Sequence, residues 1–475
     1  MVPEGFWVSD LRRPGLLVLW LLLAGCQAGL PQTRARLDHE GAVYVYLEPL
    51  TPEAERLRVS LAGISARHRD GGELALALAL RELRGQELGR QRLLAAGALP
   101  AGEYSGLVFR TAKASLRGQE GEAALLVPEA SATTAFTFTV RRGEGSVISL
   151  ALKYAESVDA GFSFRPAFAA HLPARPPVAL MGFVANSRSN DVTVFEKKSM
   201  RVFDVIATGA EPSGMALDQR AGKVYVALSR DDGVEVVDVM ADRITDRVRL
   251  TPGDGPVALA LTPDGRTLLS ANRGSNTVSV IDPVSRFELM KIRVGNGPRA
   301  VLVDRAGRLA FVLNGLSSTV SVIDLLNRVV IRSIPTDPGP VQGHLNRRGD
   351  RLYVIHDIAS YVTVINATTL AVTGRFPLRA AMDAIKVDPS TDLVYLGGRR
   401  ELTVGVYDPF SFMAVDVVDT GMDTVTMAVD GQENALYLVS SGGNRVLVFD
   451  RIRKRMVGEL DVGDGPNWIS VMGEN

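Results

Sequence analysis

From about residue 180 onward, one pattern of hydrophobic and polar positions is repeated along the chain. In the stretch Leu268–Asp304, two short β-type runs, Leu268–Ala271 and Thr277–Ile281, are joined by a polar turn. A third run ends at Val294, and the Gly-Pro pair at 297–298 turns the chain into a fourth run. Short alternating runs separated by Gly, Pro and Asn are typical of antiparallel strands. The pattern predicts a meander of four strands.

The second run of each repeat ends in an acidic or amide residue at a nearly fixed interval. Successive spacings are 42, 44, 42, 42, 42 and 42 residues between Glu196, Asp238, Asp282, Asp324, Asn366, Asp408 and Asp450. A repeat of about 40–45 residues with four strands is the signature of a β-propeller blade. Seven copies predict a seven-bladed propeller over residues 179–475. We expect these acidic and amide side chains to accept hydrogen bonds from the turns that follow them.

The two ends of the repeat region predict how the ring closes. The region begins with the runs Gly182–Ala185 and Val192–Phe195, and no Gly-Pro-led strand precedes them. Residues 465–471 are such a strand, with no second run after it. We therefore predict that residues 466–471 form the innermost strand of the first blade, beside residues 182–185. A blade built from both ends of the region leaves no free sheet edge.

Residues 270–282, SANRGSNTVSVID, resemble the signature of YVTN-type propeller repeats in bacterial and archaeal surface and periplasmic proteins. The resemblance covers roughly residues 180–475 and is weaker in the sixth repeat, where Gly397–Glu401 replaces the Asn-bearing turn. It implies the fold. It implies no single function, because propellers of this kind host both binding and hydrolytic activities.

Residues 1–25 have the features of a secretory signal. Arg12 and Arg13 precede the apolar run Leu16–Ala24, which is too short to span a bilayer. Leu23-Ala24-Gly25-Cys26 resembles a bacterial lipobox, which implies that Cys26 is lipidated and attaches the protein to a membrane. Gln27, in place of Asp, implies the outer membrane by the same resemblance. A plain signal peptide and an uncleaved anchor are the alternatives.

The residues between the predicted signal peptide and the propeller lack the propeller repeat, but they also alternate as strands. The whole chain is therefore predicted to be all-β. Residues 26–40 are a tether, and residues 41–160 alternate as a small antiparallel β-sandwich, with a hairpin of Ala135–Val140 and Ser146–Leu152. This part resembles an uncharacterised sandwich domain of bacterial lipoproteins. Residues 161–178 are rich in Pro and Phe and are predicted to be a linker. Its prolines favour a stiff spacer, while its phenylalanines could instead pack between the domains.

Composition and motifs argue against several classes of function, among them nucleic-acid binding and metal-dependent catalysis. The chain has 53 basic and 53 acidic residues, so its net charge gives no electrostatic support for a nucleic-acid partner. No HExxH, Cys-rich or His-rich spacing and no GxSxG or P-loop motif occurs, and we expect no metal or other cofactor. His344 is interpreted as a structural histidine of an inner strand.

We expect ligand-binding residues on the face built by the Gly-Pro turns and by the turns between first and second runs. The candidates are Arg299, Asp383, Asn467 and Trp468 near the axis, and His356 and Arg399 in the outer turns. Solvated turns, with Trp468 as a plug, are the plain alternative. The expected function is a non-enzymatic surface or periplasmic lipoprotein that binds a protein or a polysaccharide of the envelope. The alternative is a lactonase-like hydrolase with an axial site. The oligomeric state is open.

Overall fold

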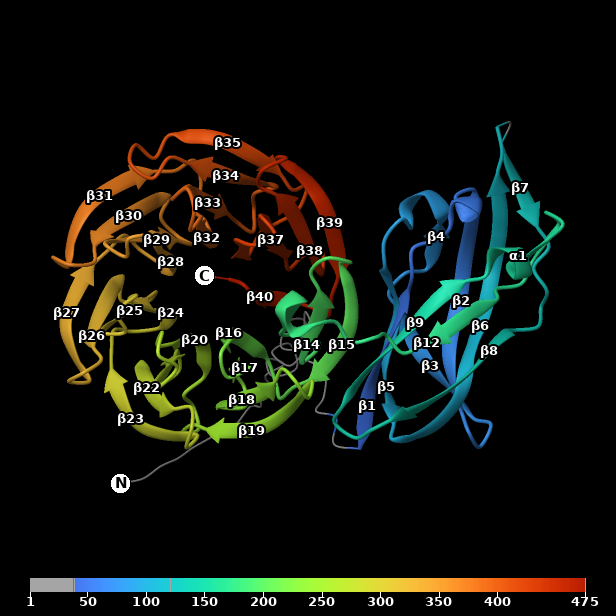
Figure 1. Cartoon of the computed structure of the whole chain (residues 1–475), viewed down its shortest axis with the longest axis horizontal. Helices are drawn as coiled ribbons and strands as arrows, with labels where there is room; N and C mark the ends of the chain where they lie inside the picture. Colours follow the sequence, from blue (N-terminus) through green and yellow to red (C-terminus); the bar gives the residue numbers. More distant parts are fainter. Residues whose placement is uncertain (1–36, 38, 120, 475) are drawn as a thin grey trace, which may run out of the picture.

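The computed structural model describes residues 37–474, except for residues 38 and 120. The predicted signal peptide and Cys26 lie outside the described residues. The regular secondary structure of the described chain is almost entirely β-strand, in a ring of blades beside an N-terminal β-rich domain (Figure 1). No helix in this part is long and apolar enough to cross a membrane.

The ring consists of seven four-stranded antiparallel sheets, as the repeat predicts. The first blade contains β15 (Arg201–Ala207), β14 (Asp191–Glu196), β13 (Met181–Asn186) and β40 (Pro466–Val471). In the other six blades, the chain runs outward from the axis to the rim. Their innermost strands are β16 (Pro212–Asp218), β20 (Pro256–Leu261), β24 (Pro298–Val303), β28 (Pro340–Leu345), β32 (Ala384–Val387) and β36 (Thr426–Asp430).

The remaining strands of these blades follow in the same order. The second strands are β17 (Lys223–Leu228), β21 (Leu268–Asn272), β25 (Leu309–Asn314), β29 (Arg351–His356), β33 (Val394–Gly397) and β37 (Ala435–Ser440). The third strands are β18 (Gly233–Asp238), β22 (Thr277–Asp282), β26 (Thr319–Asp324), β30 (Tyr361–Asn366), β34 (Thr403–Tyr407) and β38 (Arg445–Asp450). The outermost strands are β19 (Arg243–Arg249), β23 (Phe287–Arg293), β27 (Val329–Pro335), β31 (Ala371–Pro377), β35 (Ala414–Asp419) and β39 (Arg455–Asp461).

The predicted ring closure is confirmed. β40 pairs antiparallel with β13, and Gly182 lies opposite Val471 and Ala185 opposite Trp468. Figure 1 shows β40, in red, completing the innermost position of the first blade. Residues almost 300 positions apart in the sequence therefore share one sheet, and no blade has an open inner edge.

In the second to seventh blades, the turns after the third strands are built as predicted; in the first blade the carboxylate of Glu196 accepts from Ser199 Oγ instead. The carboxylate of Asp282 accepts a hydrogen bond from Val284 N at 2.9 Å, and that of Asp450 accepts one from Ile452 N at the same distance. Asp238, Asp324, Asn366 and Asp408 make equivalent contacts. These Asx-turns fix the direction in which the chain enters each outermost strand.

In most blades the second strand ends in a buried polar residue. Asn272 and Asn314 have no exposed surface. The amide of Asn272 donates to Ser279 Oγ at 2.7 Å and that of Asn314 to Ser321 Oγ at 2.9 Å, so each ties its turn to the third strand. This contact explains the asparagine of the repeat, because a buried amide must find hydrogen-bond partners inside the protein.

The N-terminal domain differs from the predicted antiparallel sandwich. Its ten strands form one connected sheet in the order β12-β9-β1-β5-β3-β2-β6-β7, with β4 paired to β2 and β8 to β6. The strands are β1 (Glu40–Leu47), β2 (Leu57–His68), β3 (Glu73–Leu78), β4 (Glu82–Arg84), β5 (Arg92–Pro100), β6 (Gly102–Arg117), β7 (Glu122–Leu125), β8 (Ala132–Val140), β9 (Gly145–Leu152) and β12 (Phe168–His171). β1 and β9 are parallel, so the sheet is mixed.

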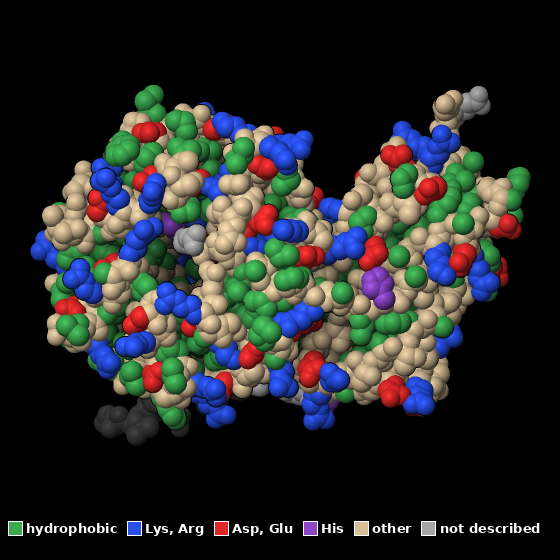
Figure 2. Space-filling view, viewed as in Figure 1, with side chains coloured by type: hydrophobic (Ala, Val, Ile, Leu, Met, Phe, Trp, Pro, Cys, Tyr) green, Lys and Arg blue, Asp and Glu red, His purple; other side chains and the backbone are tan. Residues whose placement is uncertain are grey.

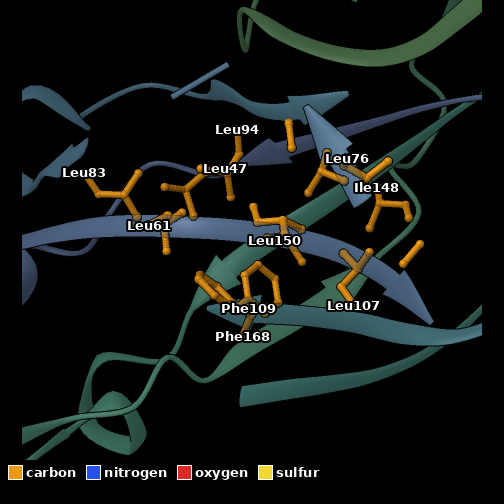
Figure 3. Packing of buried hydrophobic residues seen from close by; sticks show 14 of the residues in the cluster. Leu47, Leu61, Leu76, Leu83, Leu94, Leu107, Phe109, Ile148, Leu150 and Phe168 are labelled. Carbon is orange, nitrogen blue, oxygen red and sulfur yellow. The ribbon is translucent and has the colours of Figure 1, made fainter. Parts of the chain in front are cut away.

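This sheet folds over a single core. Phe109 of β6 and Phe168 of β12, from distant positions in the strand order, have their ring centroids 4.6 Å apart. Leu47, Leu61 and Leu150 fill the space between the two halves (Figure 3). The predicted hairpin of Ala135–Val140 with Ser146–Leu152 is therefore wrong. β8 joins β6 in one half, and β9 joins β1 and β12 in the other.

The predicted linker is also too long. Phe164 and Phe168 are 1% and 7% exposed and pack in the core of the N-terminal domain. The strands β11 (Ser163–Phe164), which pairs with β10 (Val158–Asp159), and β12 lie within the predicted linker and belong to the N-terminal domain. The chain then reaches the 3-10 turn Val178–Leu180 and the propeller.

The two domains pack directly against each other, rather than being held apart. Residues 43, 45 and 47 of β1 face its own domain, whereas Ala42, Tyr44 and Tyr46 are buried in a second cluster with Val205 of β15 and Val462. Tyr44 donates its hydroxyl hydrogen bond to Asp191, and Tyr46 donates to the carbonyl of Asp461 at 3.2 Å. β1 is therefore a strand with two buried faces.

Charged groups complete this interface. The carboxylate of Asp461, only 9% exposed, accepts from Arg90 at 2.9 Å, from Arg92 at 2.8 Å and from Leu93 N at 3.0 Å. Charge-assisted bonds of this kind are about twice as strong as neutral ones. They fix the orientation of the N-terminal domain on the first and seventh blades.

Asp204 of β15 gives the protein a testable pH dependence. Burial and, to a smaller extent, the neighbouring Asp242 and Glu144 carboxylates raise the pKa of Asp204 to about 7. Because its pKa is higher in the folded than in the unfolded chain, the contribution of Asp204 to stability is present below about pH 4 and is lost as the pH rises through about 7. Asp204→Asn should remove this loss and stabilise the protein by about 1–3 kcal/mol at pH 8. Thermal melts of the parent and the variant at pH 5 and pH 8 measure this difference. If the melting temperature of both proteins falls equally from pH 5 to pH 8, Asp204 is not the cause of the pH dependence.

Candidate functional site

Two of the hollows on the propeller are candidate ligand sites. The innermost strands begin at the Gly-Pro turns, and these lie beside the ends of the second strands; Pro256, for example, pairs with Asn272. One hollow lies on this Gly-Pro face. The other hollow lies on the axis of the ring and extends to the ends of the innermost strands that are opposite the Gly-Pro turns.

The hollow on the Gly-Pro face lies between the sixth, seventh and first blades. It has a volume of about 680 Å³, and we call it the arginine pocket. Three guanidinium groups from different blades line it, together with one carboxylate and two apolar side chains. The lining residues are Arg188, Arg399, Leu402, Met422, Asp423, Ser440, Ser441, Gly442, Gly443 and Arg445.

The charges of this pocket are only partly neutralised. Arg188 lies 2.7 Å from Asp464, and this contact lowers the pKa of the Asp464 carboxyl. Arg445 lies 2.7 Å from Glu459. The side chain of Arg399 is 57% exposed, and its Nε is 3.4 Å from Asp383. Arg399 is therefore the most accessible of the three cations.

Asp423 shapes the floor of the pocket. Its carboxylate accepts hydrogen bonds from the backbone N–H groups of Ser441 and Gly442, at 3.2 Å each, and from Ser440 Oγ. These contacts hold the turn between β37 and β38 in one conformation. A rigid turn costs less entropy when a ligand is bound.

The predicted ligand-binding residues do not form one cluster. Arg399 and Asp383 meet at the arginine pocket. Arg299 forms an ion pair with Asp357 of the next blade at 3.0 Å. Asn467 donates its amide to the Pro212 carbonyl at 3.1 Å and so links the first blade to the second. Trp468 lines the axial cavity.

His356 was predicted to lie on the binding face, but it has no exposed surface. It ends β29, at the position that Asn272 and Asn314 occupy in their blades. Its Nδ1 lies 3.0 Å from the carbonyl of Tyr361, across the turn. Burial is the main cause of its lowered pKa. His356 therefore belongs to the interior of the blade.

The axial cavity has a volume of about 460 Å³ and is lined by the innermost strands of all seven blades. Figure 2 shows a hollow at the axis of the ring with Lys and Arg side chains near it. His344 and Lys386 occupy the register position at which Ala216, Ala260 and Ala428 stand in other blades. Lys386 was not predicted as a site residue, although this register could have identified it.

His344 is neutral in this setting. Its Nδ1 is 2.7 Å from the carbonyl of Leu345. Burial, followed by the positive charges of Lys386 and Arg305, lowers the pKa of His344 to about 3. Within the described residues, no group of three or more His, Cys, Asp or Glu side chains is placed to hold a metal ion.

Comparisons with known proteins agree with the architecture. Residues 175–383 match the protein family described as YncE-like beta-propeller. The propeller is similar to this family. No curated protein sequence matches the chain.

Solved structures give the same result at low sequence identity. A functionally unknown protein from Desulfotomaculum acetoxidans is 13% identical, with 62% of this chain and 99% of that chain covered and a TM-score of 0.56. Dihydro-heme d1 dehydrogenase NirN in complex with DHE is 14% identical, with coverages of 64% and 78% and a TM-score of 0.50. Hydrazine synthase from Kuenenia stuttgartiensis is 20% identical, with coverages of 54% and 87% and a TM-score of 0.46. The first two similarities concern the fold alone.

Proposed function

We propose that this protein is an envelope lipoprotein, anchored in the outer membrane through Cys26, whose propeller is a non-enzymatic binding module for a protein or polysaccharide of the envelope. The observation that carries the proposal is the arginine pocket. Guanidinium groups from the first, sixth and seventh blades converge there, and Arg399 is more than half exposed. Arginine side chains recognise carboxylate and phosphate groups with paired hydrogen bonds. The expected partner therefore carries acidic groups.

The capture of an envelope partner tests this proposal. The full chain is used as bait for solubilised envelope material, and the double variant Arg188→Ala/Arg399→Ala is compared with the parent. We expect the captured partner to fall at least tenfold, because the pocket loses two of its three cations, while the melting temperature stays within about 2 °C. Arg453→Ala, an exposed arginine in the turn between β38 and β39, is the matched control. Capture that survives the double variant would contradict the proposal.

Membrane attachment is tested separately. Cys26→Ser should leave the protein soluble or uncleaved, because the acyl chains on Cys26 would attach it to the membrane once the leader is removed. Metabolic labelling with a palmitate analogue should mark the parent and not the variant. Equal labelling of both proteins would end the lipobox interpretation.

A hydrolase with an axial site is the second candidate, and the axial cavity supports it. His344 Nδ1 donates to a carbonyl, so its Nε2 has a lone pair for a proton. However, a pKa of about 3 makes this imidazole a weak base at neutral pH, which favours binding over catalysis. If the parent protein hydrolyses a lactone and His344→Gln abolishes this activity, the hydrolase becomes the favoured function.

A further inference from the structure

The axial cavity has a positively charged end. Lys386 of β32 and the arginines that follow β24 and β28, Arg305 and Arg347, line it. Lys386 is mostly buried, with a side-chain exposure of 13%. Neither arginine has a carboxylate partner among the described residues, and Arg347 donates to the carbonyl of Ser390 at 3.3 Å. Such an end attracts an anion.

A carboxylate of the chain itself already occupies this end. The side chain of Glu474 forms an ion pair with Lys386, and among the described lining residues it is the only carboxylate. Gln219 holds the backbone beside it through two hydrogen bonds, from its Nε2 to the Glu474 carbonyl at 2.7 Å and from Gly473 N to its Oε1 at 3.0 Å. The segment after β40 thus places one carboxylate group at Lys386.

The rest of the cavity wall is largely apolar. Leu259, Val301, Ile385 and Met427 line it, and the indole of Trp468 adds an aromatic surface. A volume of about 460 Å³ is within the range of about 300–1,000 Å³ that small-molecule sites have. A charged end joined to an apolar wall suits a ligand with one carboxylate and a hydrophobic body.

We propose that the axial cavity binds a small organic carboxylate with an apolar body, whose carboxylate replaces Glu474 at Lys386 while its body lies against Trp468. Glu474 then acts as a competitor within the chain. If an internal group blocks a site in most molecules, the apparent dissociation constant of the ligand rises. It equals the intrinsic constant divided by the fraction of molecules in which the site is open. This site is distinct from the arginine pocket and does not depend on the function proposed for it.

Trp468 provides the signal for the test. The chain has three tryptophans, so the full chain with Trp7→Phe and Trp20→Phe has Trp468 as its only indole. Its fluorescence is titrated with 3-phenylpropionate and with the neutral amide of the same acid. The Glu474→Gln variant should bind the carboxylate about tenfold more tightly than the parent, as expected if Glu474 closes the site in about nine-tenths of molecules. The amide should not show this gain.

Lys386→Gln in the Glu474→Gln background should abolish the binding, and an unchanged melting temperature shows that the propeller is intact. Three results would overturn the proposal: no gain for Glu474→Gln, equal binding of the amide, or binding that survives the loss of Lys386. The arginine pocket variant Arg188→Ala/Arg399→Ala should bind 3-phenylpropionate like its parent. The two proposals can therefore fail independently.

Discussion

A chain truncated after Asp464 is expected to lose its folded propeller at growth temperature. The deletion removes β40, which fills the innermost position of the first blade. It exposes the edge of β13 and takes Ile469 and Val471 out of a shared core, where they are 3% and 0% exposed. Burying each such side chain contributes about 1.5–3 kcal/mol. The total loss approaches the whole stability of an ordinary domain.

A shorter deletion is the matched control for this experiment. Removing residues 473–475 leaves β40 complete and should shift the melting temperature by only a few degrees. Circular dichroism melts of the three proteins measure the difference. A chain without residues 465–475 that melts like the parent would show that ring closure contributes little to stability.

The second large effect is expected for Lys197→Met. Lys197 and Asp430 form an ion pair with side-chain exposures of 1% and 0%, and Lys197 Nζ also donates to the carbonyl of Met472. The pair joins the first blade to the seventh. Removing one partner of a buried ion pair leaves the other charge without compensation and costs about 3–5 kcal/mol.

Two further variants separate this effect from side-chain size. Lys198→Met changes a lysine that is 60% exposed and 4.0 Å from Glu433, and it should change the free energy of unfolding by less than about 1 kcal/mol. Lys197→Met/Asp430→Asn removes both charges and keeps an acceptor for Gln432 N, which lies 2.9 Å from the present carboxylate. This double variant should recover most of the loss in urea unfolding. If it is no more stable than Lys197→Met, unpaired charge is not the cause.

The sequence predicted the Gly-Pro face better than the positions of single side chains on it. Arg399 and Asp383 do meet there, because their turns follow the repeat register. His356 is hidden, because it ends a second strand at the buried position that Asn272 and Asn314 hold in their blades. Trp468 does line the axial cavity, but Lys386 and Glu474 are not among the predicted residues, because they lie far apart in the sequence and only the closed ring brings them together.

What the sequence determined by itself is the propeller. Each blade is made of neighbouring strands joined by short turns, so the period of 42 residues contains almost every pairing, and the unmatched strand at 466–471 defines the closure. In the N-terminal domain the decisive pairings are between distant segments, such as β1 with β9 and β9 with β12. The alternation of polar and apolar residues shows which residues of a strand share a face. It does not show which strand pairs with this one, or what packs on its other face. Only the tertiary structure could decide that Tyr44 and Tyr46 lie against the propeller, because their partners Asp191 and Asp461 stand more than a hundred residues away.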